Sequence, residues 1–423
     1  MNRKKWLIFI LLPVLLIIFM SQPALAVAVN NGLLGYGSRG PTVSELQKEL
    51  HQAGYYPEGI ISGYFGSLTL SAVTRLEMKN KLPVDGRVGW AEWSVLNNSN
   101  STKRTSTKLS RMVLSFYCVD YTGDRRSYDS LQANSQLIDH VATFDYQISG
   151  NGNINGNISP EALKLAKSRG VKTIMLVHNI NGSIDGFSAY SAISNRANRN
   201  RLIGDIVTKL KKYGFDGVNI DLEGIPAQGR QSYTTLLHEL GEILQQEKKL
   251  LTVAIPAKTY DNPSDHWSGA YDYKAIGSIA DHVVIMSYDE HWFGGAPGPV
   301  ASLPWVVKVM DYAVITIPRS KILMGIGCFG YDWSAPGQGK AVTWQAMNGL
   351  ISRYGNVQWD NYSSAPHLVY WKDGRKHDVW YENSSSLAIK LNLVNNYNLG
   401  GIAFWRLGLE DQSFWKTVYS KLK

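Results

Sequence analysis

The 423-residue sequence has only two cysteines, Cys118 and Cys328, and each falls in an apolar, strand-like run. Thiols in such runs are expected to be buried and free, with a disulfide left open in an oxidising compartment. Neither cysteine has the spacing of a metal ligand, and no other metal-binding pattern is visible. The cysteine content therefore gives no support to a disulfide framework or a metal centre.

Three further features are missing. No basic block is dense enough to indicate nucleic-acid binding. No Gly-rich phosphate loop follows the first predicted strand, which disfavours an open, doubly wound nucleotide-binding sheet. After the N-terminal run, no segment is long and apolar enough to cross a bilayer. We expect no nucleic acid, no cofactor and no stable membrane span, and nothing in the sequence indicates more than a monomer.

The composition favours a protein of two parts that meets an anionic polymer. The formal charge is +9, from 43 basic and 34 acidic side chains, and a positive excess favours an anionic polymer such as a bacterial wall. The chain also has 13 Trp and 23 Tyr, rings that can stack on sugars although most aromatics are core. Its length and 44% apolar content predict a small module and a large domain.

Residues 1–26 have the pattern of a secretory signal peptide. A basic start at residues 3–5 precedes an apolar run at residues 6–20, and Ala24-Leu25-Ala26 is an A-x-A cleavage site. An uncleaved membrane anchor is the alternative, which the short run disfavours. We therefore predict a secreted protein, and the sequence does not distinguish the wall, a spore layer and the medium.

Residues 33–96 predict a small three-helix module. Val43, Leu46 and Leu50 recur at helical spacing, and Gly54 ends this helix. The segment resembles the small three-helix type of peptidoglycan-binding domain, through Gly37-x-x-Gly-x-x-Val-x-x-Leu-Gln-x-x-Leu, Phe65-Gly66-x-x-Thr69 and Asp85-Gly86-x-Val88-Gly89. The resemblance implies a wall-binding role, with a spacer that has no ligand as the alternative. Residues 97–108, rich in Ser, Thr and Asn, predict a flexible linker.

From Arg111 onward, strand-like runs alternate with helical stretches. Eight strands are predicted, at residues 112–119, 140–148, 172–179, 217–223, 251–258, 282–288, 322–328 and 401–407. Eight such units in about 300 residues predict an α/β fold, a (β/α)8 TIM barrel over 111–423. The long stretch at about 330–398, which contains several Trp, Tyr and His residues, predicts a small α+β insertion.

The fourth predicted strand has an unusual polar face. Because side chains alternate along a strand, the apolar residues at 218, 220 and 222 share one face, and Asn219, Asp221 and Glu223 share the other. Such groups on a buried strand cost several kcal/mol each unless they are paired or functional. A solvated edge strand is the alternative, which the apolar opposite face disfavours. We therefore predict that the polar face points into a site at the C-terminal end of a barrel strand.

The same strand carries the main resemblance to a known family. It contains Asp216-Gly-Val-Asn-Ile-Asp-Leu-Glu223, which resembles the Asp-x-x-Asp-x-Asp-x-Glu motif of glycoside hydrolase family 18. Met286-Ser-Tyr-Asp289 is similar to the family's Met-x-Tyr-Asp, and Trp405 to the tryptophan beneath the bound sugar. Two features depart from chitinases: Asn219 replaces an Asp, and Val177-His-Asn-Ile180 replaces Ser-x-Gly-Gly. Both variants occur in the branch of spore cortex and peptidoglycan N-acetylglucosaminidases, which the C-terminal half also resembles.

The resemblance implies a glycosidase in which the substrate's own acetamido group is the nucleophile. Glu223 would then be the general acid and later the base, and Asp221 would share its proton and orient the acetamido group. Tyr288 would donate a hydrogen bond to that group. Further substrate contacts are expected from Asn219, Trp405, Asp289, Tyr117, Asn179 and Asp145. Asp216 is expected to be structural.

The sequence thus predicts a secreted endo-β-N-acetylglucosaminidase associated with a cell wall or spore. It would cut β-1,4 bonds after N-acetylglucosamine in peptidoglycan or its cortex form, with retention of configuration. A chitinase is the second interpretation, which the wall-binding module and Asn219 disfavour. A non-catalytic lectin on the same barrel is the third, and it is disfavoured because such proteins usually lose the acid at the position of Glu223. The residues alone do not decide the exact glycan, or whether cleavage is endo, as the resemblance implies, or exo.

Overall fold

The computed structural model describes residues 34–56, 59–101 and 111–423. The signal peptide predicted at 1–26 and residues 102–108 of the predicted linker lie outside the described residues. Within the described part of the chain, no helix is long and apolar enough to cross a membrane.

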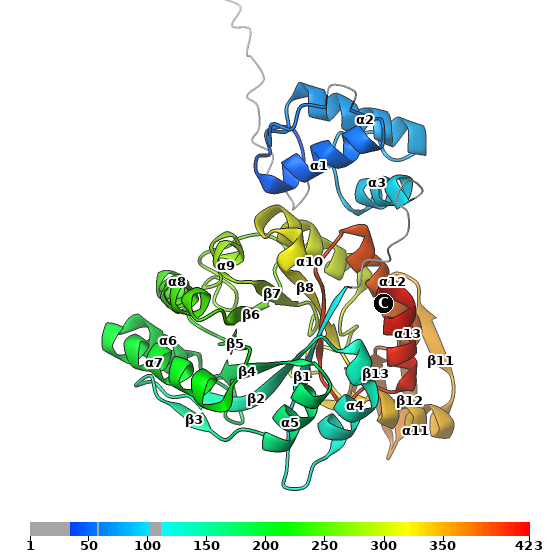
Figure 1. The fold of residues 1–423 in the computed structure, drawn as a ribbon. Coiled ribbons are helices and arrows are strands. Elements are labelled where there is room, and N and C mark those ends of the chain that lie inside the picture. The colour runs from blue at the N-terminus through cyan, green and yellow to red at the C-terminus, as the bar shows by residue number, and fades with distance from the viewer. Residues whose placement is uncertain (1–33, 57–58, 102–110) are drawn as a thin grey trace, which may run out of the picture. The chain divides into compact units, whose positions relative to one another are not determined.

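The N-terminal module consists of three helices, α1 (Pro41–Gln52), α2 (Ser67–Asn80) and α3 (Trp90–Ser101), drawn in blue to cyan in Figure 1. Their apolar faces meet in a small core that includes Val43, Leu46, Leu50, Val73, Leu76, Trp93 and Leu96. Gln47, from the Leu-Gln pair of the motif, is buried and donates to Thr69 Oγ1 at 2.9 Å, which connects α1 to α2. The third helix continues to Ser101, past the predicted end at Leu96.

Eight parallel strands form a closed barrel, as predicted (Figure 1). In chain order they are β1 (Met112–Tyr117), β2 (His140–Ile148), β4 (Lys172–His178), β5 (Gly217–Asp221), β6 (Leu250–Pro256), β7 (His282–Met286), β8 (Ile322–Gly327) and β14 (Gly401–Trp405). Their order in the sheet follows the chain, and β1 pairs with both β2 and β14, which closes the barrel. The short strand β3 (Ile154–Gly156) adds antiparallel to β2. The predicted (β/α)8 fold is therefore confirmed.

Helices surround the strands and connect them. They are α4 (Arg126–Asn134), α5 (Pro160–Ser168), α6 (Gly186–Ser194), α7 (Arg196–Tyr213), α8 (Arg230–Gln246), α9 (Tyr273–Ile279), α10 (Leu303–Thr316), α12 (Ser384–Asn396) and α13 (Gln412–Leu422). Short 3-10 turns lie at Ser135–Leu137, Ala227–Gly229 and Arg319–Lys321. Local sequence sets the helix ends: Asn195 caps α7 by accepting from two backbone N–H groups, and Gly214 ends it at a φ of 65°.

Alternation along the strands produces two apolar layers. Side chains such as Leu114, Phe116 and Leu176 fill the barrel interior. Side chains of the opposite parity, such as Val113 and Met175, pack with the surrounding helices in the larger cluster. Strands that are buried on both faces are typical of parallel sheets covered by helices.

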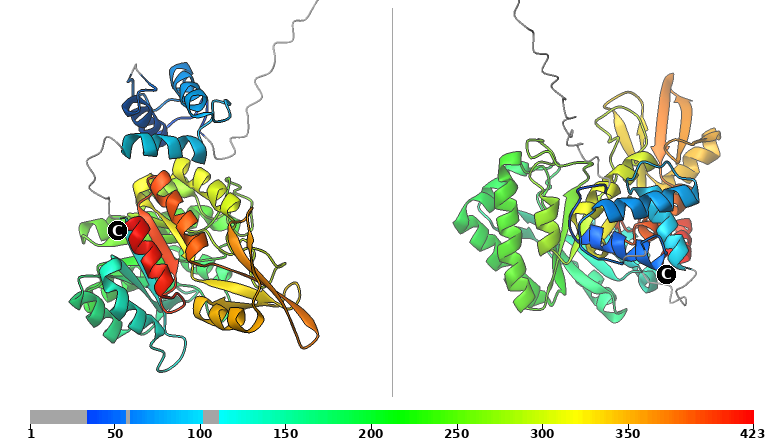
Figure 2. Two further views of the ribbon diagram at one scale, coloured as in Figure 1. Left: turned by 90° about the vertical axis from the view of Figure 1, so that its right-hand side faces the viewer. Right: turned by 90° about the horizontal axis from the view of Figure 1, so that it is seen from above.

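The predicted α+β insertion follows β8. It consists of β9 (Phe329–Trp333), β10 (Gly339–Thr343), α11 (Trp344–Tyr354), β11 (Val357–Asp360), β12 (Ala365–Lys372) and β13 (Arg375–Tyr381). The five strands form one antiparallel sheet, and the β12–β13 hairpin, in orange, projects away from the barrel (Figure 2). The sheet ends at Tyr381, and the following helix α12 returns the chain to β14. The insertion is thus shorter than the predicted 330–398 region.

A repeated contact joins neighbouring strands at the N-terminal end of the barrel, which we call the barrel floor. Asp139, Asp216 and Asp281 each precede a strand directly, and each accepts a backbone N–H from the strand before it. The donors are Val113, Thr173 and Leu251, at 2.8, 2.7 and 2.8 Å. These carboxylates therefore satisfy strand-end N–H groups that have no ladder partner.

Two histidines, buried His140 and half-buried His282, also lie at the barrel floor. Their rings are 6.1 Å apart, and the Nδ1 atom of each is buried without a hydrogen-bond partner among the described residues. Burial lowers the pKa of His140 to about 4, so this ring is neutral at physiological pH.

Candidate active site

The predicted polar residues of β5 lie at its C-terminal end, which opens at the barrel mouth. The strand ends at Asp221, which is 4% exposed, and Glu223 lies in the loop that follows. The sequence predicted that Glu223 lies on the strand. The structure instead places it beyond the last residue of the ladder. This position is where barrel enzymes carry their catalytic groups.

Asp221, which is buried, and Glu223, which is half-buried, form a pair of carboxyl groups. Burial raises both pKa values, and the charges of Asp221 and Asp289 raise that of Glu223 further. Asp221 Oδ1 is buried without a hydrogen-bond partner among the described residues. Groups arranged in this way share protons, so Glu223 stays protonated well above the pH at which an exposed carboxyl group ionises.

Tyr288 lies next to the carboxyl pair, just after β7. Burial, followed by the charges of Asp221 and Glu223, raises its pKa well above the ordinary value. Its ring packs edge-on to Phe329, with centroids 5.9 Å apart. The phenol therefore keeps its proton and can donate a hydrogen bond. The neighbouring Asp289 is exposed, has a φ of 61°, and accepts from Tyr331 Oη at 2.8 Å.

Trp405 is the last residue of β14 and is half-buried. Its ring lies 5.5 Å from that of Phe116 and 5.4 Å from that of Phe144, so it rests on the aromatic top of the barrel interior. It also packs with the cluster that contains Tyr288 and Phe329. This arrangement suits an indole that stacks on a sugar.

Asn219 lies deeper in the barrel than Asp221 and is fully buried. Its Nδ2 donates to Thr252 Oγ1 at 2.8 Å, and the Thr252 hydroxyl donates to Val218 C=O at 3.2 Å. These bonds fix the orientation of the amide and leave its Oδ1 buried without a partner among the described residues. Asn219 can therefore offer an acceptor oxygen beneath the carboxyl pair.

Asn179, which follows β4 directly, contacts Glu223 but not through its carboxyl group. Its side-chain amide forms hydrogen bonds with both the N–H and the C=O of Glu223, at 2.8 and 2.7 Å. Asn179 is 1% exposed, so it lies behind the candidate acid rather than at the surface of the mouth.

Tyr117 and Asp145, two further predicted contacts, lie apart from this group. Tyr117 faces the surrounding helices, because Phe116 fills the barrel interior. Asp145 accepts from Ser159 Oγ at 3.0 Å, and burial raises its pKa to about 6. No hydrogen bond or ring contact within the described residues joins either of them to Glu223. Asp216 lies at the opposite end of its strand, at the barrel floor.

Three residues of the site carry no signal in the sequence. Tyr271 donates to Leu222 C=O at 2.8 Å and so holds the segment before Glu223. Thr252 orients Asn219, and Tyr331, from the insertion, bonds Asp289. Each comes from a distant part of the chain and lies outside the recognised motifs, so only the fold identifies it.

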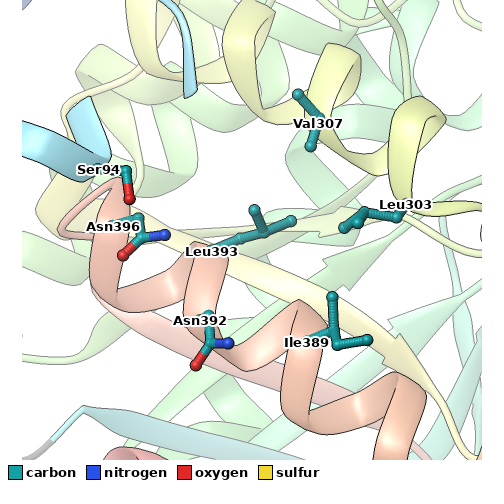
Figure 3. Close-up of a pocket in the computed structure, with 7 residues that line it drawn as sticks. All are labelled: Ser94, Leu303, Val307, Ile389, Asn392, Leu393 and Asn396. Carbon is teal, nitrogen blue, oxygen red and sulfur yellow. The ribbon is translucent and has the colours of Figure 1, made fainter. Parts of the chain in front are cut away.

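A separate cavity lies on the outer side of the barrel, between α10 and α12 (Figure 3). It is lined by Ser94, Leu303, Val307, Ile389, Asn392, Leu393 and Asn396. None of these side chains titrates, so the cavity has no group for acid–base chemistry. The barrel mouth is therefore the candidate active site. Within the described residues, no cluster of three His, Cys, Asp or Glu side chains could hold a metal ion.

Comparison with family profiles places these residues among known proteins. The profile of glycosyl hydrolases family 18 matches residues 89–410, and that of a peptidoglycan binding domain matches residues 39–96. The first therefore covers most of the chain, including every residue of the barrel mouth described above.

Individual relatives agree with the profiles. The chain is 33% identical over 305 residues to the uncharacterized glycosylase YvbX of Bacillus subtilis, which covers 70% of this chain and 88% of that protein. It is 29% identical to the cortical fragment-lytic enzyme of the same organism, over 66% of this chain and 67% of that protein. A chitinase structure from Chromobacterium violaceum superposes with a TM-score of 0.70 at 33% identity, covering 74% of this chain and 99% of the chitinase.

Proposed function

The chain belongs to glycosyl hydrolase family 18 and is a glycosidase, and from this premise we propose that it cleaves β-1,4 bonds after N-acetylglucosamine in peptidoglycan. The observation that carries the proposal is the carboxyl pair at the barrel mouth, buried Asp221 and half-buried Glu223, with the Tyr288 hydroxyl beside it. Such a pair supplies a protonated acid at neutral pH.

The proposed reaction begins with proton transfer from Glu223 to the glycosidic oxygen. The acetamido oxygen of the N-acetylglucosamine attacks its own anomeric carbon as the bond to the leaving sugar breaks, which forms an oxazolinium ion. Asp221 accepts a hydrogen bond from the acetamido N–H, and Tyr288 donates one to the acetamido group. The Glu223 carboxylate then deprotonates a water molecule, which attacks the same anomeric carbon. The oxazolinium ring opens, and the configuration at that carbon is retained.

Two observations favour peptidoglycan as the substrate. A peptidoglycan binding domain profile matches the N-terminal module. The chain also matches a cortical fragment-lytic enzyme over 67% of that enzyme's length. This similarity favours a wall or spore location. Chitin oligomers are a second candidate substrate, because the chitinase from Chromobacterium violaceum matches over 99% of its length. A lectin on the same barrel is disfavoured because Glu223 is present beside Asp221 and its pKa is raised.

The test is mass spectrometry of the fragments that the protein releases from vegetative peptidoglycan, spore-cortex peptidoglycan and chitin oligomers. We expect fragments with N-acetylglucosamine at the reducing end, and Glu223→Gln is expected to lower their release by about 10³-fold. Glu242→Gln is the matched control, because its side chain is 65% exposed on α8. Intact wall in every sample, with the protein bound to it, would instead indicate a lectin.

A further inference from the structure

The contact between Asn179 and Glu223 involves the main chain of the candidate acid. Asn179 Oδ1 accepts from the Glu223 N–H at 2.8 Å, and Asn179 Nδ2 donates to the Glu223 C=O at 2.7 Å. Both polar groups of the side chain are therefore engaged by a single residue. Because Asn179 is 1% exposed, little of it is left to meet a substrate.

The side-chain amide of Asn179 supplies the hydrogen bonds that a neighbouring strand would supply if the ladder of β5 continued. The last pair between β4 and β5 joins His178 to Asp221, and the last pair between β5 and β6 joins Ile220 to Val253. Glu223 lies beyond both, so no strand supplies partners for its peptide groups. The Asn179 amide offers one acceptor and one donor, as a neighbouring strand would.

The residues on either side of Asn179 are fixed as well. His178 stacks on Phe144 with ring centroids 3.8 Å apart, and its Nδ1 accepts from the Ile180 N–H at 3.1 Å. The Asn179 C=O accepts from the Asp185 N–H at 3.0 Å. The amide is therefore presented to Glu223 from a rigid support rather than from a free loop.

The segment after Glu223 has little room to move. Gly224 has a φ of 63°, a conformation that favours glycine. A Cβ atom on Gly186, at the start of α6, would lie 1.8 Å from the Gly224 carbonyl oxygen. The main chain of residues 223–224 is therefore held by Asn179 and in close contact with Gly186.

We propose that Asn179 is a positioning residue, which fixes the main chain of Glu223 so that its carboxyl group stays aimed at the glycosidic oxygen. This role replaces the substrate contact that the sequence predicted for Asn179, and it rests on the proposed function of Glu223. Displacing a catalytic group by about 1 Å can cost about 10²-fold in rate. Asn179 therefore acts on kcat rather than on the binding of the sugar.

The variant Asn179→Asp tests this role, because it keeps the size and the acceptor but removes the donor. We expect kcat to fall about 10²-fold while KM changes by less than about threefold. The alkaline limb of the kcat profile is expected to move to higher pH, because the new carboxylate at position 179, in addition to Asp221, opposes the ionisation of Glu223. Asn181→Asp is the matched control: it makes the same chemical change at an exposed position of the same loop and should leave kcat and the profile unchanged.

Two outcomes would overturn the inference: a variant with wild-type kcat, or one in which KM rises while kcat is kept, which would make Asn179 a substrate contact. If the variant does not fold, hydrogen exchange of the wild-type chain decides the question. The Glu223 amide is expected to exchange about 10²-fold more slowly than an unprotected amide, and fast exchange overturns the inference. A wild-type chain that is inactive on every glycan refutes the proposed function instead, and the exchange measurement still tests the contact.

Discussion

Aspartates lie at both ends of the barrel strands, and their hydrogen-bond partners differ between the two ends. At the floor, Asp139, Asp216 and Asp281 each accept a backbone N–H of a neighbouring strand. At the mouth, Asp221 is buried with one oxygen that has no hydrogen-bond partner among the described residues, and burial raises its pKa and that of Glu223. The same kind of side chain therefore joins strands at one end and holds a proton at the other.

The motif on β5 spans both environments within eight residues. Asp216 begins it at the floor and Glu223 ends it beyond the mouth. Two carboxyl groups of one motif can thus have unrelated roles, which their hydrogen-bond partners distinguish. Substitutions at the two ends should separate activity from stability.

The largest expected effect is on activity, from Asp221→Asn at the mouth. We expect kcat to fall about 10²–10³-fold, because the amide can neither share a proton with Glu223 nor balance the charge of the reacting acetamido group. The thermal unfolding midpoint at pH 7.5 should be unchanged or higher, because an unpaired buried carboxyl group is removed. Kinetics with a defined oligosaccharide and thermal unfolding measure the two quantities. A destabilised variant with wild-type kcat would contradict the comparison.

Asp216→Ala at the floor is expected to have the opposite profile. Its carboxylate accepts from both the N–H and the hydroxyl of Thr173, at 2.7 and 3.1 Å. Removing a charged acceptor and leaving the N–H unpaired should lower the free energy of unfolding by about 1.5–3 kcal/mol. Denaturant unfolding measures this loss, and kcat per folded molecule should stay within about twofold of wild type. A fall in kcat comparable to that of the Asp221 variant would show that the two ends are not independent.

The smallest expected effect is in the pH dependence of stability, where the two ends have opposite signs. The raised carboxyl pKa values of Asp221 and Glu223 mean that their contribution is present at low pH and is lost as pH rises through those values. The pKa of His140 is lowered to about 4, so its contribution is present above about 6.5 and is lost as pH falls toward 4. A fall in pH should therefore destabilise the floor, and a rise in pH from acid to neutral should destabilise the mouth.

His140→Gln tests the acid side. The loss of unfolding free energy between pH 7.5 and 5.5 is expected to be about 1 kcal/mol smaller than in wild type, because one buried ring no longer has to take up a proton. His238→Gln is the matched control, since this side chain is 61% exposed. The free energy of unfolding is measured by denaturant unfolding at each pH. If it changes equally with pH in wild type and His140→Gln, His140 does not contribute to the acid dependence of stability.

Much of the fold could be predicted because apolar strand-like runs alternate with helical stretches along the chain. All eight barrel strands are present, and the fourth ends at Asp221 instead of Glu223 because the neighbouring ladders end there. The side-chain direction of Tyr117 could not be predicted, since its strand is apolar on both faces and either parity suits the pattern. The register of β2 shifts between Thr143 and Tyr146, which moves Asp145 in a way that alternation does not predict.

The site was predictable only where a motif marks it. The motifs predict Asp221, Glu223, Tyr288 and Trp405 as site residues, and these four side chains lie together at the mouth. The residues that support them, Tyr271 and Thr252, contact a main-chain oxygen and a buried amide that lie 49 and 33 positions away in the chain. A contact of this kind depends on the folding of separate segments against one another, so it leaves no local pattern.

Barrel closure also has a consequence for the growing chain on the ribosome. The first strand, β1, is completed by β14, whose Gly401 pairs with Met112. Until the last strand has been synthesised, the open edges of β1 and β8 are exposed to solvent and to other chains. A chain that is released before Gly401 would leave the edges of β1 and β8 unpaired, and we expect it to aggregate or to be degraded rather than to be partly active.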